Sequence, residues 1–173
     1  MLHCLKMKNI FKTNIKIPLT VKIKKKVNKL FIEGSKGSIC LDLSFLTLSN
    51  LTTNQKKMKY ASFFRLFQKA LIGVNLNFII RLTFVGVGFR IEAIENGFIK
   101  LKLGFSHLVY IKIPSYIKVF MTKKTFLVLK CIDEQLLKEF SSKICSYKKP
   151  DVYKGKGILY KNQVVILKEG KKK

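Results

Sequence analysis

The sequence predicts an α+β fold made of two duplicated small domains, each an antiparallel or mixed sheet covered by one helix. Three observations support this prediction. Ile15-Lys16-Ile17-Pro18 recurs unchanged as Ile111-Lys112-Ile113-Pro114, 96 residues later. Short runs of alternating apolar and polar residues, typical of half-buried strands, occur in both halves of the chain. In each half an apolar stripe at helical spacing follows these runs.

The first half reads as short strands followed by one helix. Strands are expected near residues 15–18, 21–24, 30–32 and 39–43, with a glycine turn at 34–37. The polar stretch 50–59 has the composition of a loop. A helix is expected over 60–72, ending at Gly73, with an apolar face formed by Tyr60, Phe63, Phe64, Phe67 and Leu71. Such a stripe is more typical of a core than of a base-stacking platform.

The second half repeats this order with more strands. Strands are expected at 79–85, 89–93, 98–103, 109–113, 117–120 and 126–129, and Asn96-Gly97 is a strong hairpin signal. Asp133 is placed to cap a second helix over 133–147. Its inward residues are expected to be Leu136, Leu137, Phe140 and Ile144.

The repeat extends beyond its four identical residues. Residues 21–23 align with 117–119, and residues 30–32 align with 126–128. Pro18 and Pro114 should therefore lie at equivalent strand ends, because proline cannot donate a hydrogen bond within a sheet. The predicted organisation is a basic tail (1–14), an N-terminal α+β domain (15–77), a C-terminal α+β domain (78–152) and a basic C-terminal extension (153–173).

The charge of the chain implies a large anionic partner. There are 35 Lys and Arg residues against 9 Asp and Glu, which gives a net charge of +26. Nearly all the basic residues are lysines, which suit contacts with phosphates better than the reading of base edges. An A+T-rich genome is an alternative reason for lysine over arginine, but it does not explain the scarcity of acidic residues.

Catalytic and metal-binding patterns are absent from the sequence. The four cysteines form no CxxC pair, and His3 and His107 belong to no ligand cluster, so neither a metal nor another cofactor is expected. Gly86-Val87-Gly88 lacks the third glycine of a dinucleotide fingerprint and is better explained as a bulge or strand bend. No stretch reaches the roughly 18 apolar residues that span a bilayer. We therefore expect neither an enzyme with a small-molecule substrate nor a membrane span.

Residues 148–160 are the most informative segment for function. Glycines alternate with lysines there, which lets backbone amides approach phosphates while ammonium groups flank them. Tyr153 and Tyr160 bracket the loop and are candidates for stacking on a base or sugar. The alternative is a solvated basic loop. The candidate RNA-binding residues are Lys148, Lys149, Tyr153, Lys154, Gly155, Lys156, Gly157, Tyr160, Lys168, Lys171, Lys172 and Lys173.

The segment from Tyr153 to Ile158 resembles the C-terminal signature of the uL6 family of large-subunit ribosomal proteins. Residues 85–90 and 103–107 resemble two further motifs of that family in the same order, and the turn at 34–37 resembles its N-terminal glycine-lysine turn. The resemblance covers residues 15–173. It implies two duplicated α+β domains and binding to large-subunit ribosomal RNA, beside the sarcin–ricin loop and near the base of the factor-binding stalk. Neighbouring large-subunit proteins near the stalk base are further implied partners.

Some positions depart from the family pattern. Cys131, Glu134 and Val152 replace the glycine, lysine and proline usual there, and residues 46–59 match poorly. The composition, together with a bacterial type of ribosomal protein, favours a mitochondrial ribosome, with a plastid second and an A+T-rich bacterium third. Two other function classes are alternatives: a peripheral polyanion- or membrane-binding basic module, and an enzyme acting on nucleic acid. A structural constituent of the ribosome fits the residues best.

Overall fold

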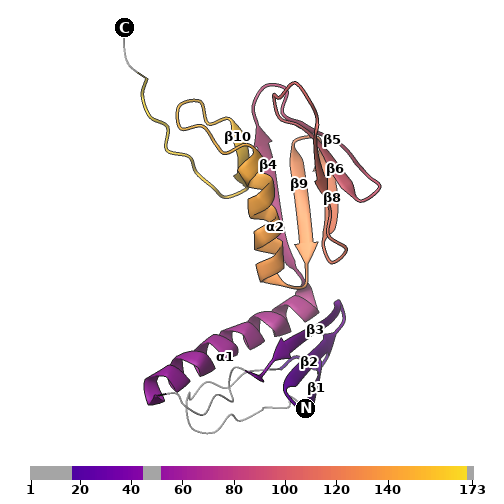
Figure 1. The fold of residues 1–173 in the computed structure, drawn as a ribbon. Helices are drawn as coiled ribbons and strands as arrows, with labels where there is room; N and C mark the ends of the chain where they lie inside the picture. Colours follow the sequence, from indigo (N-terminus) through magenta and orange to yellow (C-terminus); the bar gives the residue numbers. More distant parts are fainter. Residues whose placement is uncertain (1–16, 45–51, 171–173) are drawn as a thin grey trace. The chain divides into compact units, whose positions relative to one another are not determined.

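The structure is a computed structural model that describes residues 17–44 and 52–170 of the chain (Figure 1). Two helices and ten strands are present among these residues. In chain order they are β1 (Lys22–Lys26), β2 (Lys29–Gly34), β3 (Gly37–Asp42), α1 (Thr53–Leu76), β4 (Phe78–Val85), β5 (Arg90–Glu95), β6 (Phe98–Lys102), β7 (Val109–Lys112), β8 (Lys118–Lys123), β9 (Phe126–Cys131), α2 (Glu134–Tyr147) and β10 (Gly157–Tyr160). The predicted α+β fold class is confirmed.

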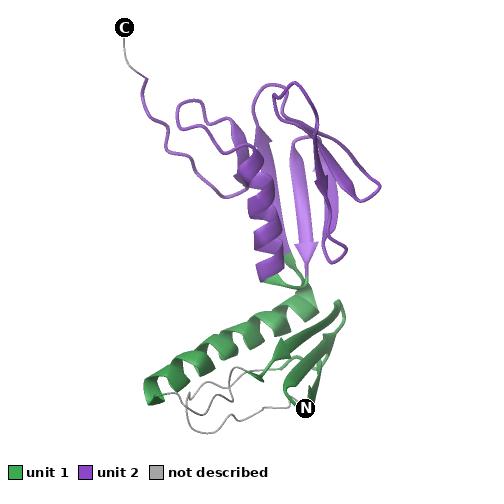
Figure 2. Cartoon of the chain, viewed as in Figure 1, with its two compact units in different colours: residues 1–78, 132–134 green, residues 79–131, 135–173 purple. Residues whose placement is uncertain are grey.

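The chain divides into two compact units (Figure 2). Unit 1 comprises residues 1–78 and 132–134, and unit 2 comprises residues 79–131 and 135–173. Residues 153–170, expected to be part of a separate extension, therefore belong to unit 2. The physical reason is β10, which pairs antiparallel with β4 and places Ile158 in the core at 1% exposure.

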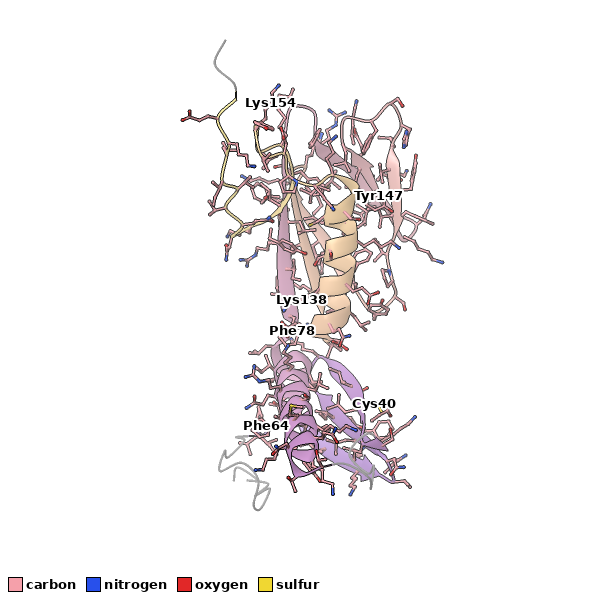
Figure 3. All side chains as sticks on the ribbon, turned by 60° about the vertical axis from the view of Figure 1, so that its left-hand side comes forward. Cys40, Phe64, Phe78, Lys138, Tyr147 and Lys154 are labelled. Carbon is pink, nitrogen blue, oxygen red and sulfur yellow. The ribbon has the colours of Figure 1, made fainter. Side chains whose placement is uncertain are left out.

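Unit 1 is a three-stranded antiparallel sheet, β1-β2-β3, packed on one face against α1 (Figure 1). Val74 and Ile32, on facing elements, are fully buried at the centre of this core. Phe67 is buried as predicted, whereas Tyr60 and Phe64 are only half-buried. Figure 3 labels Phe64 on α1 and Cys40 on β3.

The helix α1 starts earlier than the sequence predicted. It begins at Thr53, within the stretch expected to be a loop, because Thr52 and Gln55 form a capping box. The Thr52 hydroxyl accepts the Gln55 amide at 3.4 Å, and the Gln55 side chain accepts the Thr52 amide at 3.1 Å. The rest of the predicted loop, residues 50–51, lies outside the described residues, as do residues 46–49.

Gly73 lies inside α1 rather than at its end. The helix continues to Leu76, and the Asn77 amide donates to the Gly73 carbonyl at 2.9 Å. Gly73 is buried against the Ile132 backbone, and a β-carbon at this position would collide with the Ile132 carbonyl oxygen. Glycine is therefore required here because another backbone segment approaches it closely.

Gly73→Ala is expected to destabilise the protein by about 2 kcal/mol, because overpacking outweighs the roughly 1 kcal/mol by which alanine favours a helix. Urea unfolding measures the change. Gln68→Ala, at an exposed position of the same helix, should change stability by less than about 0.5 kcal/mol. Equal stability of the Gly73→Ala and Gln68→Ala variants would contradict the close approach.

Unit 2 contains two sheets where one was expected. A four-stranded sheet has the order β10-β4-β9-β8, and a three-stranded antiparallel sheet has the order β5-β6-β7. The chain leaves the first sheet at Gly86 and Gly88, whose φ angles of 145° and 76° bend it between β4 and β5. The glycine pair is thus a strand bend, as the sequence indicated.

The core of unit 2 is formed by the buried face of α2 and by apolar side chains of the strands. Leu137, Phe140 and Ile144 are buried on α2, as predicted, while Leu136 is half-buried. The fully buried apolar residues of the strands and their connections include Leu82, Ile91, Ile99, Leu101, Leu103, Leu127 and Leu129. This packing fixes β4 and α2, the two elements to which the C-terminal segment attaches.

The two halves of the sequence repeat form comparable turns. The Pro18 carbonyl accepts the Val21 amide at 3.1 Å, and the Pro114 carbonyl accepts the Ile117 amide at 3.0 Å. Each proline precedes a strand rather than lying in one, in agreement with its missing amide hydrogen. A hairpin follows in each case, β1-β2 or β8-β9. That the two units are duplicated copies remains a prediction.

The predicted alignment of residues 30–32 with residues 126–128 is shifted by one residue from the correspondence that the strand pairing gives. The register of β8-β9 shifts between Met121 and Lys123, whereas β1-β2 pairs without a shift. Buried Ile32 therefore corresponds to buried Leu129, not to half-buried Val128. A one-residue slip moves a side chain to the opposite face of a sheet, which explains why the identity of short runs misled the alignment.

Candidate nucleic-acid interface

The loop between α2 and β10 is closed by Asp151. Its two carboxylate oxygens accept the backbone amides of Tyr153 and Lys154 at 3.2 and 3.1 Å. Its own carbonyl accepts the Gly155 amide at 2.9 Å, and its amide donates to the Lys156 carbonyl at 2.9 Å. Sequence reasoning missed this role, although aspartate at the start of a turn is a recognisable signal. The loop is therefore held in one backbone conformation.

The bonds to Asp151 also determine the electrostatics of the loop. Asp151 is the only acidic residue between Lys148 and Lys168. Both its oxygens are engaged by backbone amides, so no lysine of the loop is paired with it by a salt bridge. Lys149, Lys154 and Lys156 are exposed. Figure 3 shows Lys154 on this loop, beyond the end of α2 at Tyr147. The result is a loop of fixed conformation whose exposed charged side chains are all positive.

The two glycines of the loop have different roles. Gly155 has a φ of 66° and open space around it, with only the Leu167 side chain at 3.4 Å from an added β-carbon. Gly157 is buried, and a β-carbon there would lie 2.6 Å from Pro150 Cα and 2.8 Å from the Lys149 carbonyl oxygen. Gly155 is thus a conformational requirement on the loop. Gly157 is a packing requirement where the two ends of the loop cross.

The remaining predicted site residues are arranged less uniformly. Tyr153 is 58% exposed beside the lysines. Lys168 is exposed, and its amide donates to the Val152 carbonyl at 2.9 Å, so the segment near Lys168 runs back along the loop. Lys171, Lys172 and Lys173 lie outside the described residues, as does the predicted tail 1–14.

Tyr160 is attached to α2 through its hydroxyl group. That oxygen lies 3.1 Å from the buried Ser141 Oγ and also hydrogen-bonds the Cys145 thiol. Burial raises the pKa of Cys145, and the hydrogen bond from Tyr160 opposes this rise. Tyr160 therefore joins β10 to the helix, and its contact with RNA remains a prediction.

Tyr160→Phe is expected to cost about 1 kcal/mol of stability, because it removes the hydrogen bond to the buried Ser141 hydroxyl and the one to the Cys145 thiol. RNA affinity should stay within about twofold, since the backbone of β10 is unchanged. Tyr153→Phe is the matched control and should leave stability unchanged, because Tyr153 is exposed. Chemical denaturation of both variants provides the comparison, and equal stabilities would contradict the anchoring role of Tyr160.

A second cluster, formed by Phe105, His107 and Lys148, adjoins the loop, and of its members only Lys148 was a candidate RNA-binding residue from the sequence. The rings of Phe105 and His107 stack with centroids 5.8 Å apart, and Lys148 Nζ lies 5.0 Å from the Phe105 centroid. Lys148 also accepts the Ile158 amide through its carbonyl at 3.0 Å. No local sequence signal joins residues 105 and 148, because only the fold brings them together.

The described residues offer little for other chemistries. Within residues 17–44 and 52–170, no three metal-ligating side chains gather in one place. None of the helices in that part of the chain has the length and apolar character needed to cross a membrane.

Comparison with known proteins gives a consistent result. A sequence model described as ribosomal protein L6 matches residues 85–161. The large ribosomal subunit protein uL6m of Reclinomonas americana is 36% identical, over 96% of this chain and 100% of that protein. The uL6 protein of Cellvibrio japonicus is 32% identical over the same shares. The uL6c protein of Phaeodactylum tricornutum is 35% identical, over 95% of this chain and 98% of that protein.

The fold and these relatives define a structural constituent of the ribosome, not an enzyme. The chain belongs to the uL6 family of large-subunit ribosomal proteins. The mitochondrial uL6m relative supports the predicted mitochondrial location, and the uL6c relatives match the plastid alternative.

Proposed function

We propose that the chain binds large-subunit ribosomal RNA beside the sarcin–ricin loop and near the base of the factor-binding stalk. The contact is made chiefly by the loop 148–157 and the basic segment that ends at Lys173. Neighbouring large-subunit proteins near the stalk base complete the site. The location follows from the resemblance of residues 153–158 to the family signature.

One observation carries the proposal. The Asp151-closed loop presents exposed lysines on a fixed backbone, and its only carboxylate is engaged by backbone amides. Phosphates are therefore attracted to a preorganised surface without competition from an internal ion pair. Binding through lysines and backbone amides fixes position and orientation on the RNA without reading base edges.

Reconstitution of large subunits that lack the protein tests this function. The added full-length chain should co-sediment with the subunit in one copy and protect nucleotides of the sarcin–ricin loop from chemical modification. Protection confined to other RNA regions would contradict the proposed location. Failure to co-sediment, together with binding to anionic vesicles, would contradict the ribosomal RNA contact and favour a polyanion-binding module.

A further inference from the structure

The sheet face of unit 1 that points away from α1 has an unusual composition. The strand register places Ile23, Ile32 and Ile39 side by side, and these residues pack toward the helix. The next row, Lys24, Phe31 and Cys40, therefore points to the opposite face. We call this the open face of unit 1; its members are Lys22, Lys24, Lys26, Lys29, Phe31, Glu33, Ser38, Cys40 and Asp42.

On the open face, the strand at one edge carries only positive charges, and the negative charges lie on the other two strands. The edge strand β1 contributes Lys22, Lys24 and Lys26 and no acidic residue. The two carboxylates, Glu33 and Asp42, are on β2 and β3. Lys24 Nζ lies 3.0 and 3.1 Å from the two Glu33 oxygens, so this pair is locally neutral. Lys22 and Lys26 remain as exposed cations along the outer edge.

A half-buried aromatic ring lies at the centre of the same face. Phe31 is in the middle of β2, the central strand, and Lys26 Nζ lies 5.7 Å from its ring centroid. The ammonium group thus lies over one face of the ring, and the exposed Cys40 is the register partner of Phe31 on the neighbouring strand β3. An aromatic ring on a central strand, beside cations on an edge strand, is an arrangement that holds unpaired nucleotides.

We propose that the open face of unit 1 binds a single-stranded RNA segment, with a base stacked on Phe31 and phosphates at Lys22 and Lys26. The distribution of charge favours RNA over an acidic protein segment. A nucleotide offers an uncharged base to the Phe31 ring and a phosphate to the lysines of β1, whereas an acidic side chain has no group that stacks on the ring. The phosphates then follow the lysines of β1. This contact is separate from the loop 148–157, which belongs to the other unit.

The test uses the full-length chain with Lys148, Lys149, Lys154 and Lys156 changed to alanine, so that the proposed C-terminal contact is removed. The probe is a 12-nucleotide oligouridylate with one central 5-iodouridine, which cross-links to a stacked aromatic ring under long-wavelength light. Mass spectrometry should locate the cross-link at Phe31. Phe31→Leu, which keeps an apolar side chain of similar bulk, should abolish the cross-link and weaken binding about tenfold. Phe31→Tyr should restore both.

Charge variants provide a matched control. Changing both Lys22 and Lys26 to alanine should lower the salt dependence of binding, log K against log salt, by about 1.4. Changing Lys56 and Lys57 to alanine removes the same charge from exposed positions of α1 in the same unit. That control should leave the cross-link intact and the affinity within about twofold.

Two results would overturn the inference. One is a Phe31→Leu variant that binds and cross-links like its parent. The other is displacement of the oligonucleotide from Phe31 by an oligoglutamate peptide at lower concentration than by unlabelled oligouridylate, which would indicate a protein partner. Either result leaves the C-terminal contact untouched, because that contact is measured separately in the chain with its natural lysines.

Discussion

Replacing Gly157 with valine is expected to lower the free energy of unfolding by about 3 kcal/mol or more. Two costs combine: the residue has a φ of 152°, which L-residues rarely adopt, and its β-carbon would meet the backbone of Lys149 and Pro150 at 2.6–2.8 Å. The strand β10 starts at this residue and pairs with β4, so its first pair with Val85 should be lost. Urea unfolding, followed by circular dichroism, measures the effect.

Gly170→Val is the control for this substitution. Gly170 lies in the same C-terminal segment, has no β-carbon neighbour within 4 Å and has no positive φ. Its replacement should change stability by less than about 0.5 kcal/mol. From the sequence alone, Gly155 and Gly157 were expected to serve RNA binding, by letting backbone amides approach phosphates. The contacts of Gly157 show that this glycine is needed for stability as well. Equal stability of the Gly157→Val and Gly170→Val variants would contradict that role.

Changing Lys148, Lys149, Lys154 and Lys156 together to alanine should weaken binding to large-subunit RNA by about three orders of magnitude at 0.1 M salt. Each lysine that neutralises a phosphate contributes about 0.9 to the slope of log K against log salt, so the slope should fall by nearly four. Matched and mismatched RNAs should be affected alike, because phosphate contacts carry no sequence information. Filter binding at several salt concentrations gives the slope.

The control for the lysine series keeps the net charge equal. Four exposed lysines on the strands of unit 2, Lys102, Lys112, Lys118 and Lys123, are changed to alanine instead. Their loss should reduce affinity only through the general field of the protein and should lower the slope by less than one. If the two quadruple variants gave the same slope, the phosphates would not be bound at the loop.

Side-chain periodicity predicted which side of each helix is buried, although Tyr60, Phe64 and Leu136 are only half-buried. Phe67 and Phe140 are buried because apolar residues three and four apart share one side of a helix. The start of α1 was missed because its signal, the capping pair Thr52 and Gln55, lies in a polar stretch that has the composition of a loop. The polar composition of this stretch thus led to a loop prediction, although the stretch contains the capping box that starts the helix.

The lysine–glycine loop was recognised as a candidate site, but its support was not. Strand β10 is four residues long, and its partner β4 lies more than 70 residues earlier in the chain. No local sequence pattern therefore predicts that these two strands pair. The crossing of Gly157 over Pro150 and the ring of Phe105 beneath Lys148 depend on the same pairing. Sequence reasoning found residues that carry charge and missed the residues that hold them in place.

Directed hydroxyl-radical probing tests the central claim most directly. Val152 is 43% exposed beside the lysine loop and is not one of the proposed contact lysines, so Val152→Cys offers a tether for an iron chelate. The exposed Cys40, together with Cys4, is changed to serine to prevent labelling elsewhere. In reconstituted large subunits, radicals from position 152 should cleave the sarcin–ricin loop. Radicals from Lys118→Cys, on the strand β8 at the opposite edge of the same sheet from β10, should cleave it far less. Cleavage of equal strength from both positions, or none at the sarcin–ricin loop from position 152, would contradict the account.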